Sequence, residues 1–70
     1  MSVSKKIRIL LIEREMKLKD LATLLNKAPS TISDKMTRGN FSENDLKEIA
    51  KVLNYDYDIV FIDKDTGKII

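Results

Sequence analysis

Two signals for a helix boundary lie close together in this sequence, at Asn26 and at Pro29. Apolar residues within 18–25 recur at intervals of three and four, which is the spacing of one buried helix face. Asn26 tolerates the left-handed conformation in which many helices end. Pro29 fits the first position of a helix, where its missing N–H costs no hydrogen bond. The sequence therefore predicts two helices joined by a tight turn, a helix–turn–helix.

The second of these helices is predicted to run from Pro29 to about Thr37. Ile32 and Met36 lie four positions apart and share one face, which we expect to be buried. Gly39 and its neighbours end the helix. The outward face consists of small polar residues, which would let another molecule dock closely.

Further helices are predicted on both sides of this motif. Residues 4–16 show helical spacing, with Ser4 as the expected N-cap. Residues 42–54 show it as well, and Ser42 with Asp45 forms a shorter-armed variant of the capping box. The expected core consists of Ile7, Leu10, Leu21, Leu25, Ile32, Met36, Leu46, Ile49 and Leu53.

The sequence pattern changes after residue 55. Residues 57–62 alternate with a period of two and are rich in β-forming residue types, which predicts a strand. Residues 63–67 have the composition of a turn, and 68–70 can return as a short second strand. The side chains expected to cover the helices are Tyr57, Ile59 and Phe61.

Composition excludes several kinds of chemistry. The chain has no cysteine and no histidine, which excludes disulfides, Cys/His zinc sites and histidine acid–base catalysis. It also lacks a glycine-rich phosphate loop, so we expect neither an enzyme nor a cofactor or metal site. No apolar run is longer than that of residues 9–12, which is too short to cross a membrane. We therefore expect a soluble cytoplasmic protein with no small-molecule ligand.

The net charge of +2 is unevenly distributed. Residues 1–40 carry nine Lys/Arg and four Asp/Glu, whereas residues 41–70 carry four and seven. A basic first half suits a polyanionic partner, which would be attracted through its phosphates in a salt-dependent manner. The alternative is an ordinary solvated surface with a chance asymmetry.

Three groups of residues carry a resemblance to a known family. Leu21-Ala22, Asn26 and Ile32-Ser33 resemble the "LA…G…IS" core of the phage-repressor and Cro-like (xenobiotic-response-element-type) helix-turn-helix family. Residues 26–33, NKAPSTIS, are similar to its "GKSPSxIS" version, and residues 46–54 resemble its "dL..IA..L(G/N)" segment. The resemblance covers roughly residues 7–55. It implies a mainly α, four-helix lambda-repressor-like DNA-binding domain over 1–55, with the β-hairpin of 56–70 as an extension.

The chain departs from the family pattern at several positions. Leu18 stands where many members have a phosphate-binding Gln. Leu11 and Met36 occupy positions that many members fill with an Arg and a Glu, so an ion pair is exchanged for an apolar contact. Asn26 replaces the usual Gly, which a left-handed position tolerates.

The resemblance also implies which residues meet DNA, through insertion of helix 29–37 in the major groove. The candidates for base readout are Ala28, Pro29, Ser30 and Asp34. The candidates for phosphate contact are Lys17, Lys19, Lys27, Lys35, Thr37, Arg38 and Asn40. For Thr31 and Ser33 we expect hydrogen bonds to the local backbone instead.

These expectations combine into a sequence-specific transcriptional regulator, a repressor of phage or mobile-element type that binds double-stranded DNA as a homodimer. The expected dimerisation residues lie on the second face of the hairpin: Val60, Ile62, Ile69 and Ile70. A hairpin that only caps the helices is the alternative for this segment. For the whole chain the alternative is a protein-interaction module, such as an antitoxin or adaptor, that uses the same fold.

Overall fold

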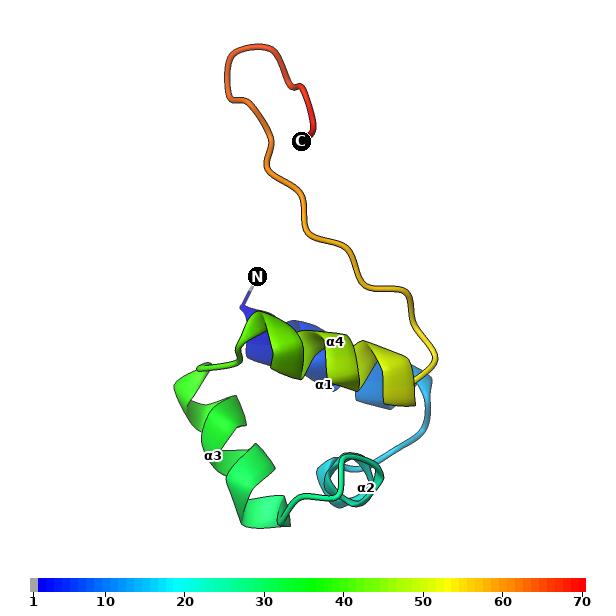
Figure 1. Cartoon of the computed structure of the whole chain (residues 1–70). Helices are drawn as coiled ribbons and strands as arrows, with labels where there is room; N and C mark the ends of the chain where they lie inside the picture. Colours follow the sequence, from blue (N-terminus) through cyan, green and yellow to red (C-terminus); the bar gives the residue numbers. More distant parts are fainter. Residues whose placement is uncertain (1) are drawn as a thin grey trace.

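The structure is a computed structural model that describes residues 2–70. Its helices are α1 (Val3–Glu13), α2 (Leu18–Leu24), α3 (Pro29–Arg38) and α4 (Glu43–Val52). Helix α2 packs against both α3 and α4, and α1 lies behind α4 in Figure 1. All four predicted helices are present. The mainly α fold with a helix–turn–helix formed by α2 and α3 is therefore confirmed.

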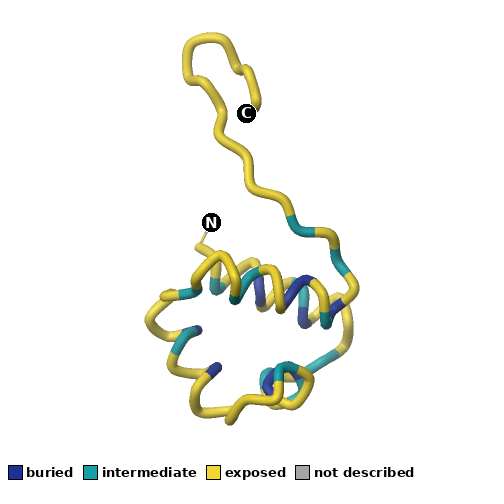
Figure 2. The backbone as a smooth tube through the Cα atoms, viewed as in Figure 1, coloured by how far each residue is buried: buried dark blue, intermediate teal, exposed yellow. Residues whose placement is uncertain are grey.

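One apolar core joins the four helices. Leu21 of α2 and Ile32 of α3 are fully buried at its centre. Burial of each such side chain stabilises the fold by about 1.5–3 kcal/mol. The other buried members of the cluster are Ile7, Leu11, Ala22, Met36, Ile49 and Leu53. The buried positions line the inner sides of the helices (Figure 2). Of the expected core residues, Leu10, Leu25 and Leu46 are only half-buried at its edge.

The helix ends of the motif and of α4 follow their local sequence. Pro29 is the first residue of α3, and Asn26 before it has the left-handed φ of 57°. Gly39 ends α3 with a φ of 68°. The side chain of Ser42 accepts a hydrogen bond from the N–H of Asp45, whose carboxylate accepts one from the N–H of Ser42. These predicted boundaries are confirmed.

Helix α1 differs from its prediction at both ends. Ser2 is the N-cap, because its hydroxyl accepts a hydrogen bond from the N–H of Lys5. The prediction that Ser4 caps this helix is wrong. Ser4 lies inside the first turn, and its hydroxyl instead donates to the carbonyl of Met36 at 2.7 Å. The helix ends at Glu13, and Glu15 then adopts a left-handed φ of 54°.

The predicted β-hairpin is not formed as strands. Between residues 56 and 70 the structure has one isolated antiparallel bridge, Ile62 to Ile69, with two backbone hydrogen bonds between Phe61 and Ile70. This doubled-back segment leads away from the helices (Figure 1). Ile59 and Phe61 are 54% and 69% exposed, so the prediction that they cover the helices is wrong. Two short arms with no third strand or helix face beneath them do not stabilise a sheet.

Candidate nucleic-acid interface

The turn between α2 and α3 forms one end of the molecule, opposite the tail (Figure 1). The N–H of Lys27 donates to the carbonyl of Ala22 at 2.9 Å, which satisfies the last turn of α2. The carbonyl of Ala28 then accepts hydrogen bonds from Thr31 and Ile32 and opens α3. A single turn thus fixes the direction of α3 relative to α2.

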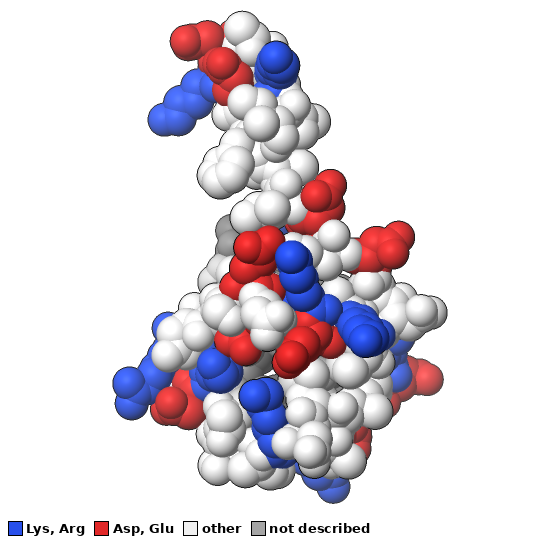
Figure 3. Space-filling model, viewed as in Figure 1, with Lys and Arg blue, Asp and Glu red and all other residues white. Residues whose placement is uncertain are grey.

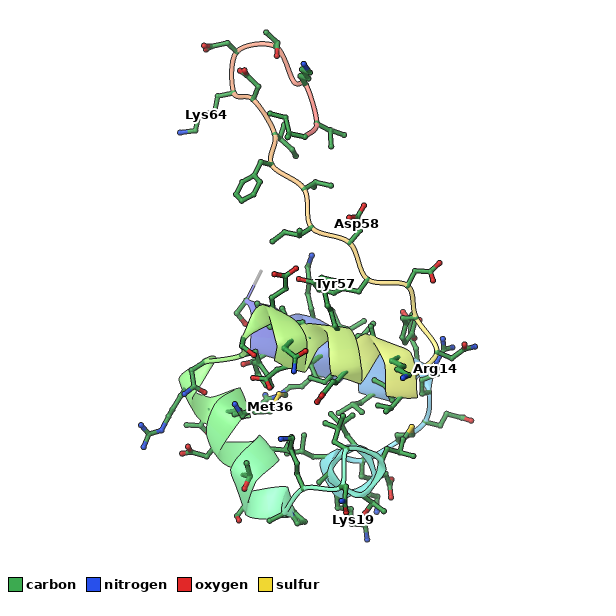
Figure 4. All side chains as sticks on the ribbon, in the orientation of Figure 1. Arg14, Lys19, Met36, Tyr57, Asp58 and Lys64 are labelled. Atoms are coloured by element: carbon green, nitrogen blue, oxygen red, sulfur yellow. The ribbon has the colours of Figure 1, made fainter. Side chains whose placement is uncertain are left out.

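Burial of one side of α3 determines which residues face outward. Ile32 and Met36 are buried in the core, and Figure 4 shows Met36 directed toward it. The opposite side of the helix is therefore exposed to solvent. The four residues expected to read bases are all exposed, Ser30 and Asp34 on this side of the helix and Ala28 and Pro29 at its N-terminal end.

Asp34 is paired with another candidate of the same surface. Its carboxylate accepts a hydrogen bond from Nε of Arg38 at 2.9 Å, one turn further along α3. The two side chains are 58% and 68% exposed, so water screens the pair and its contribution to stability is small. The pair places a positive charge beside the only acidic group of α3.

Lys35 does not extend freely from α3. Its Nζ lies 3.0 Å from the carboxylate of Asp45, and both side chains are largely covered. The pKa of Asp45 is lowered, first by the hydrogen bond from the N–H of Ser42 and then by the one from Lys35. Lys35 therefore joins α3 to the start of α4, a role that the sequence did not indicate.

Thr37 is likewise occupied within α3. Its hydroxyl donates to the carbonyl of Ser33 at 3.0 Å. That bond uses the only proton the side chain has to donate. We expected the hydroxyl of Ser33 to bond the backbone. It is instead the carbonyl of Ser33 that accepts the hydrogen bond from Thr37.

The remaining phosphate candidates are exposed: Lys17, Lys19, Lys27 and Asn40. Lys19 extends from α2 away from the core, at the same end of the molecule as the turn (Figure 4). Acidic side chains gather instead over α4 on the face shown in Figure 3. Basic side chains lie between and below these acidic ones in the same view.

A helical domain with a short turn before an exposed, small-residue α3 is typical of one class of DNA-binding domain. The family model of the Cro/C1-type HTH DNA-binding domain matches residues 6–58. The chain belongs to this family. Comparisons with curated proteins and with solved structures find no match.

Membership in the Cro/C1-type family makes the chain a DNA-binding regulator of transcription, with DNA as its partner. The resemblance found in the sequence is thereby confirmed. Within residues 2–70, no group of acidic side chains is arranged to hold a metal ion. In the same part of the chain no helix has the length and apolar character needed to cross a membrane.

Three of the four departures from the family pattern meet at one place in this Cro/C1-type domain. Leu11, Leu18 and Met36 line a common hollow of about 300 Å³ between α1, α2 and α3. Leu11 and Met36, the two apolar residues that replace the ion pair, thus belong to the core and line the hollow. Arg8 lies on the same hollow and was not singled out in the sequence. Its position one helical turn before Leu11 could have indicated in the sequence that it lies on the same side of the helix.

Proposed function

We propose that this Cro/C1-type domain is a sequence-specific repressor, of phage or mobile-element type, that inserts α3 in the major groove. The observation that carries the proposal is the division of α3 into two sides. Ile32 and Met36 anchor the helix in the core, whereas Ser30 and Asp34 are exposed. The anchored side fixes the helix, and the small exposed side permits close approach to base edges.

Each readout candidate has a chemistry that suits a base. Ser30 can donate or accept a hydrogen bond, and Asp34 can accept one from the amino group of cytosine. Ala28 and Pro29 can contact the methyl group of thymine. The pairing of Asp34 with Arg38 supports this role, because the guanidinium offsets the repulsion between a carboxylate and nearby phosphates.

The phosphate contacts follow from exposure and charge. We assign them first to the side chains that carry no ion pair within residues 2–70, namely Lys17, Lys19, Lys27 and Asn40. Arg38 joins them through the N–H groups that it does not donate to Asp34. Lys35 and Thr37 remain candidates for phosphate contact. Their binding to a phosphate costs free energy, because each must first break its bond to an internal partner.

Selection of bound fragments from random duplex DNA tests the readout. The wild-type chain should enrich one sequence, and the double change Ser30→Ala, Asp34→Ala should change that preference. An unchanged preference would show that these residues do not read bases. Binding should also weaken steeply with salt, because phosphate contacts release counterions. A chain that binds no duplex even at low salt would instead fit a protein-interaction module.

We propose further that the repressor acts as a dimer through its tail. Val60, Ile62, Ile69 and Ile70 are all exposed in one copy. The backbone groups of Val60 and Ile62 have no hydrogen-bond partner within the described chain. An unpaired edge with apolar side chains is a surface on which a second copy can add its own edge. The tail leaves from the end opposite the α2–α3 turn, so this contact does not cover α3 (Figure 1).

Sedimentation of edge variants tests the dimer. Val60→Lys with Ile62→Lys should produce a monomer, because two charges on the edge repel a second copy. Asp65→Lys, in the turn of the tail, makes the same change of net charge and serves as the control. Equal association of both variants would contradict a tail-mediated dimer.

A further inference from the structure

Arg8 of α1 lies beside α3 although the two are distant in sequence. It lines the hollow of about 300 Å³ together with Leu18, Ser33 and Thr37. The walls of this hollow are mostly apolar, which suits the methylene stem of an arginine. The side chain is exposed, so its charged end can remain in water.

Among residues 2–70, Arg8 has no partner that would hold its guanidinium. The three ion pairs within residues 2–70 use Lys35, Arg38 and Lys47 as their cations. No side-chain hydrogen bond of Arg8 is formed in the same part of the chain. Its five N–H donors are therefore available to a ligand.

The other side chains that line this hollow offer a ligand no free positive charge. The hydroxyl proton of Thr37 is given to Ser33, and Lys35 lies on the other side of α3, where Asp45 holds it. Leu18 brings an apolar side chain to a position on the same hollow. This side of α3 thus has its free positive charge supplied by α1.

We infer that Arg8 is a DNA phosphate contact, made from α1 along the side of α3. The inference rests on the proposed insertion of α3 in the major groove, which brings one DNA backbone past this side of the helix. A guanidinium matches the two oxygens of a phosphate with two parallel N–H donors. Arg8 would strengthen binding to every sequence and leave the sequence preference unchanged.

Lys6 provides a matched control on the same helix. It is exposed and lines a different groove, with Leu46 and Tyr57, on the α4 side of α1. Arg8→Gln and Lys6→Gln each remove one positive charge from α1. The two variants therefore change the net charge equally and differ in the surface from which the charge is lost.

The experiment measures the affinity of both variants for the selected duplex and for an unrelated duplex over a range of salt concentrations. Arg8→Gln should weaken binding to both duplexes by roughly tenfold. It should also reduce the slope of log K against log salt by about 0.9, the value for one phosphate. Lys6→Gln should keep the wild-type slope, and Arg8→Lys should retain the slope with part of the affinity.

The outcomes separate this inference from the function on which it rests. A wild-type slope for Arg8→Gln, or an equal loss for Lys6→Gln, would overturn the role of Arg8 while DNA binding stands. A wild-type chain that binds neither duplex at low salt would overturn the proposed function and the inference together. Circular dichroism of each variant establishes that the helices are intact.

Discussion

The hydroxyl of Ser4 donates a hydrogen bond to the carbonyl of Met36 at 2.7 Å, across 32 residues of sequence. Met36 belongs to the last turn of α3, where carbonyls lack partners within the helix. The first turn of α1 thus satisfies the end of α3. This bond ties the end of α3 to the rest of the domain.

Ser4→Ala should therefore lower the free energy of unfolding by about 1 kcal/mol, since a partly buried hydrogen bond is lost. Urea denaturation measures the change. Ser33→Ala is the control, because the Ser33 hydroxyl makes no hydrogen bond within the described residues and alanine favours the helix. A cost for Ser4→Ala no larger than that for Ser33→Ala would show that the bond does not stabilise the fold.

Arg14 joins the ends of α1 and α4 in a similar way. Its guanidinium donates to the carbonyls of Leu53 and Asn54 at 2.8 and 3.1 Å and lies 3.9 Å from the ring centroid of Tyr55. Arg14→Lys should cost about 1–2 kcal/mol, because an ammonium reproduces neither the paired donors nor the flat stacking. Thermal or urea unfolding measures it. Arg8→Lys, which has no internal partner to lose, should leave stability unchanged, and equal effects would refute the assignment.

Glu15 adopts a left-handed φ of 54°, which is strained for a residue with a Cβ atom. Glu15→Gly should raise the free energy of unfolding by about 0.5–1 kcal/mol, after subtraction of the larger entropy of glycine in the unfolded chain. Glu15→Ala keeps the Cβ and should show no such gain. If alanine stabilises as much as glycine, the effect comes from the lost carboxylate and not from the backbone.

Asp45 should make stability depend on pH in acid. Its folded pKa lies below its ordinary value of 3.8, first because of the N–H of Ser42 and then because of Lys35. The folded state therefore binds fewer protons, and this contribution is present above pH 3.8 and is lost as pH falls through the folded pKa. Unfolding free energies measured down the acid range should fall more steeply for the wild type than for Asp45→Asn.

Lys35→Gln provides the intermediate case for the same titration. It removes the second cause of the lowered pKa and leaves the hydrogen bond from Ser42 in place. The unfolding free energy of Lys35→Gln should fall with decreasing pH less steeply than that of the wild type and more steeply than that of Asp45→Asn. Parallel curves for all three proteins would mean that Asp45 does not contribute to the acid dependence.

Features that depend on neighbouring residues could be predicted from the sequence. Pro29 has a fixed φ suited to the first turn of a helix, and Ser42 with Asp45 closes its capping box within four residues. Asn26 needs only its own tolerance of the left-handed region. The period of the apolar residues placed Ile32 and Met36 on the buried side in the same way.

Features that depend on packing between distant residues could not be predicted from the sequence. The partners of Ser4 and Arg14 lie more than 30 residues away, so no local pattern contains them. The sequence therefore made Ser4 a cap, and it left Lys35 available for DNA although Asp45 holds it. The tail has the alternation of a strand. A β-ladder, however, needs several consecutive bridges to a partner strand, and residues 56–70 form only one, between Ile62 and Ile69.

If α3 docks as proposed, the ion pair between Asp34 and Arg38 makes sequence preference and backbone affinity dependent on one another. The Nε–H bound to Asp34 at 2.9 Å is not available to a phosphate, so DNA competes with Asp34 for that one donor, while the other N–H groups of Arg38 can still turn to the backbone. Removal of the carboxylate frees a cation and takes away a repelling charge in one step. A domain that loses Asp34 should therefore hold all DNA more tightly while distinguishing less between sequences. On the proposed readout, Asp34 would thus contribute to selectivity both by its contact with a base and by holding one donor of Arg38.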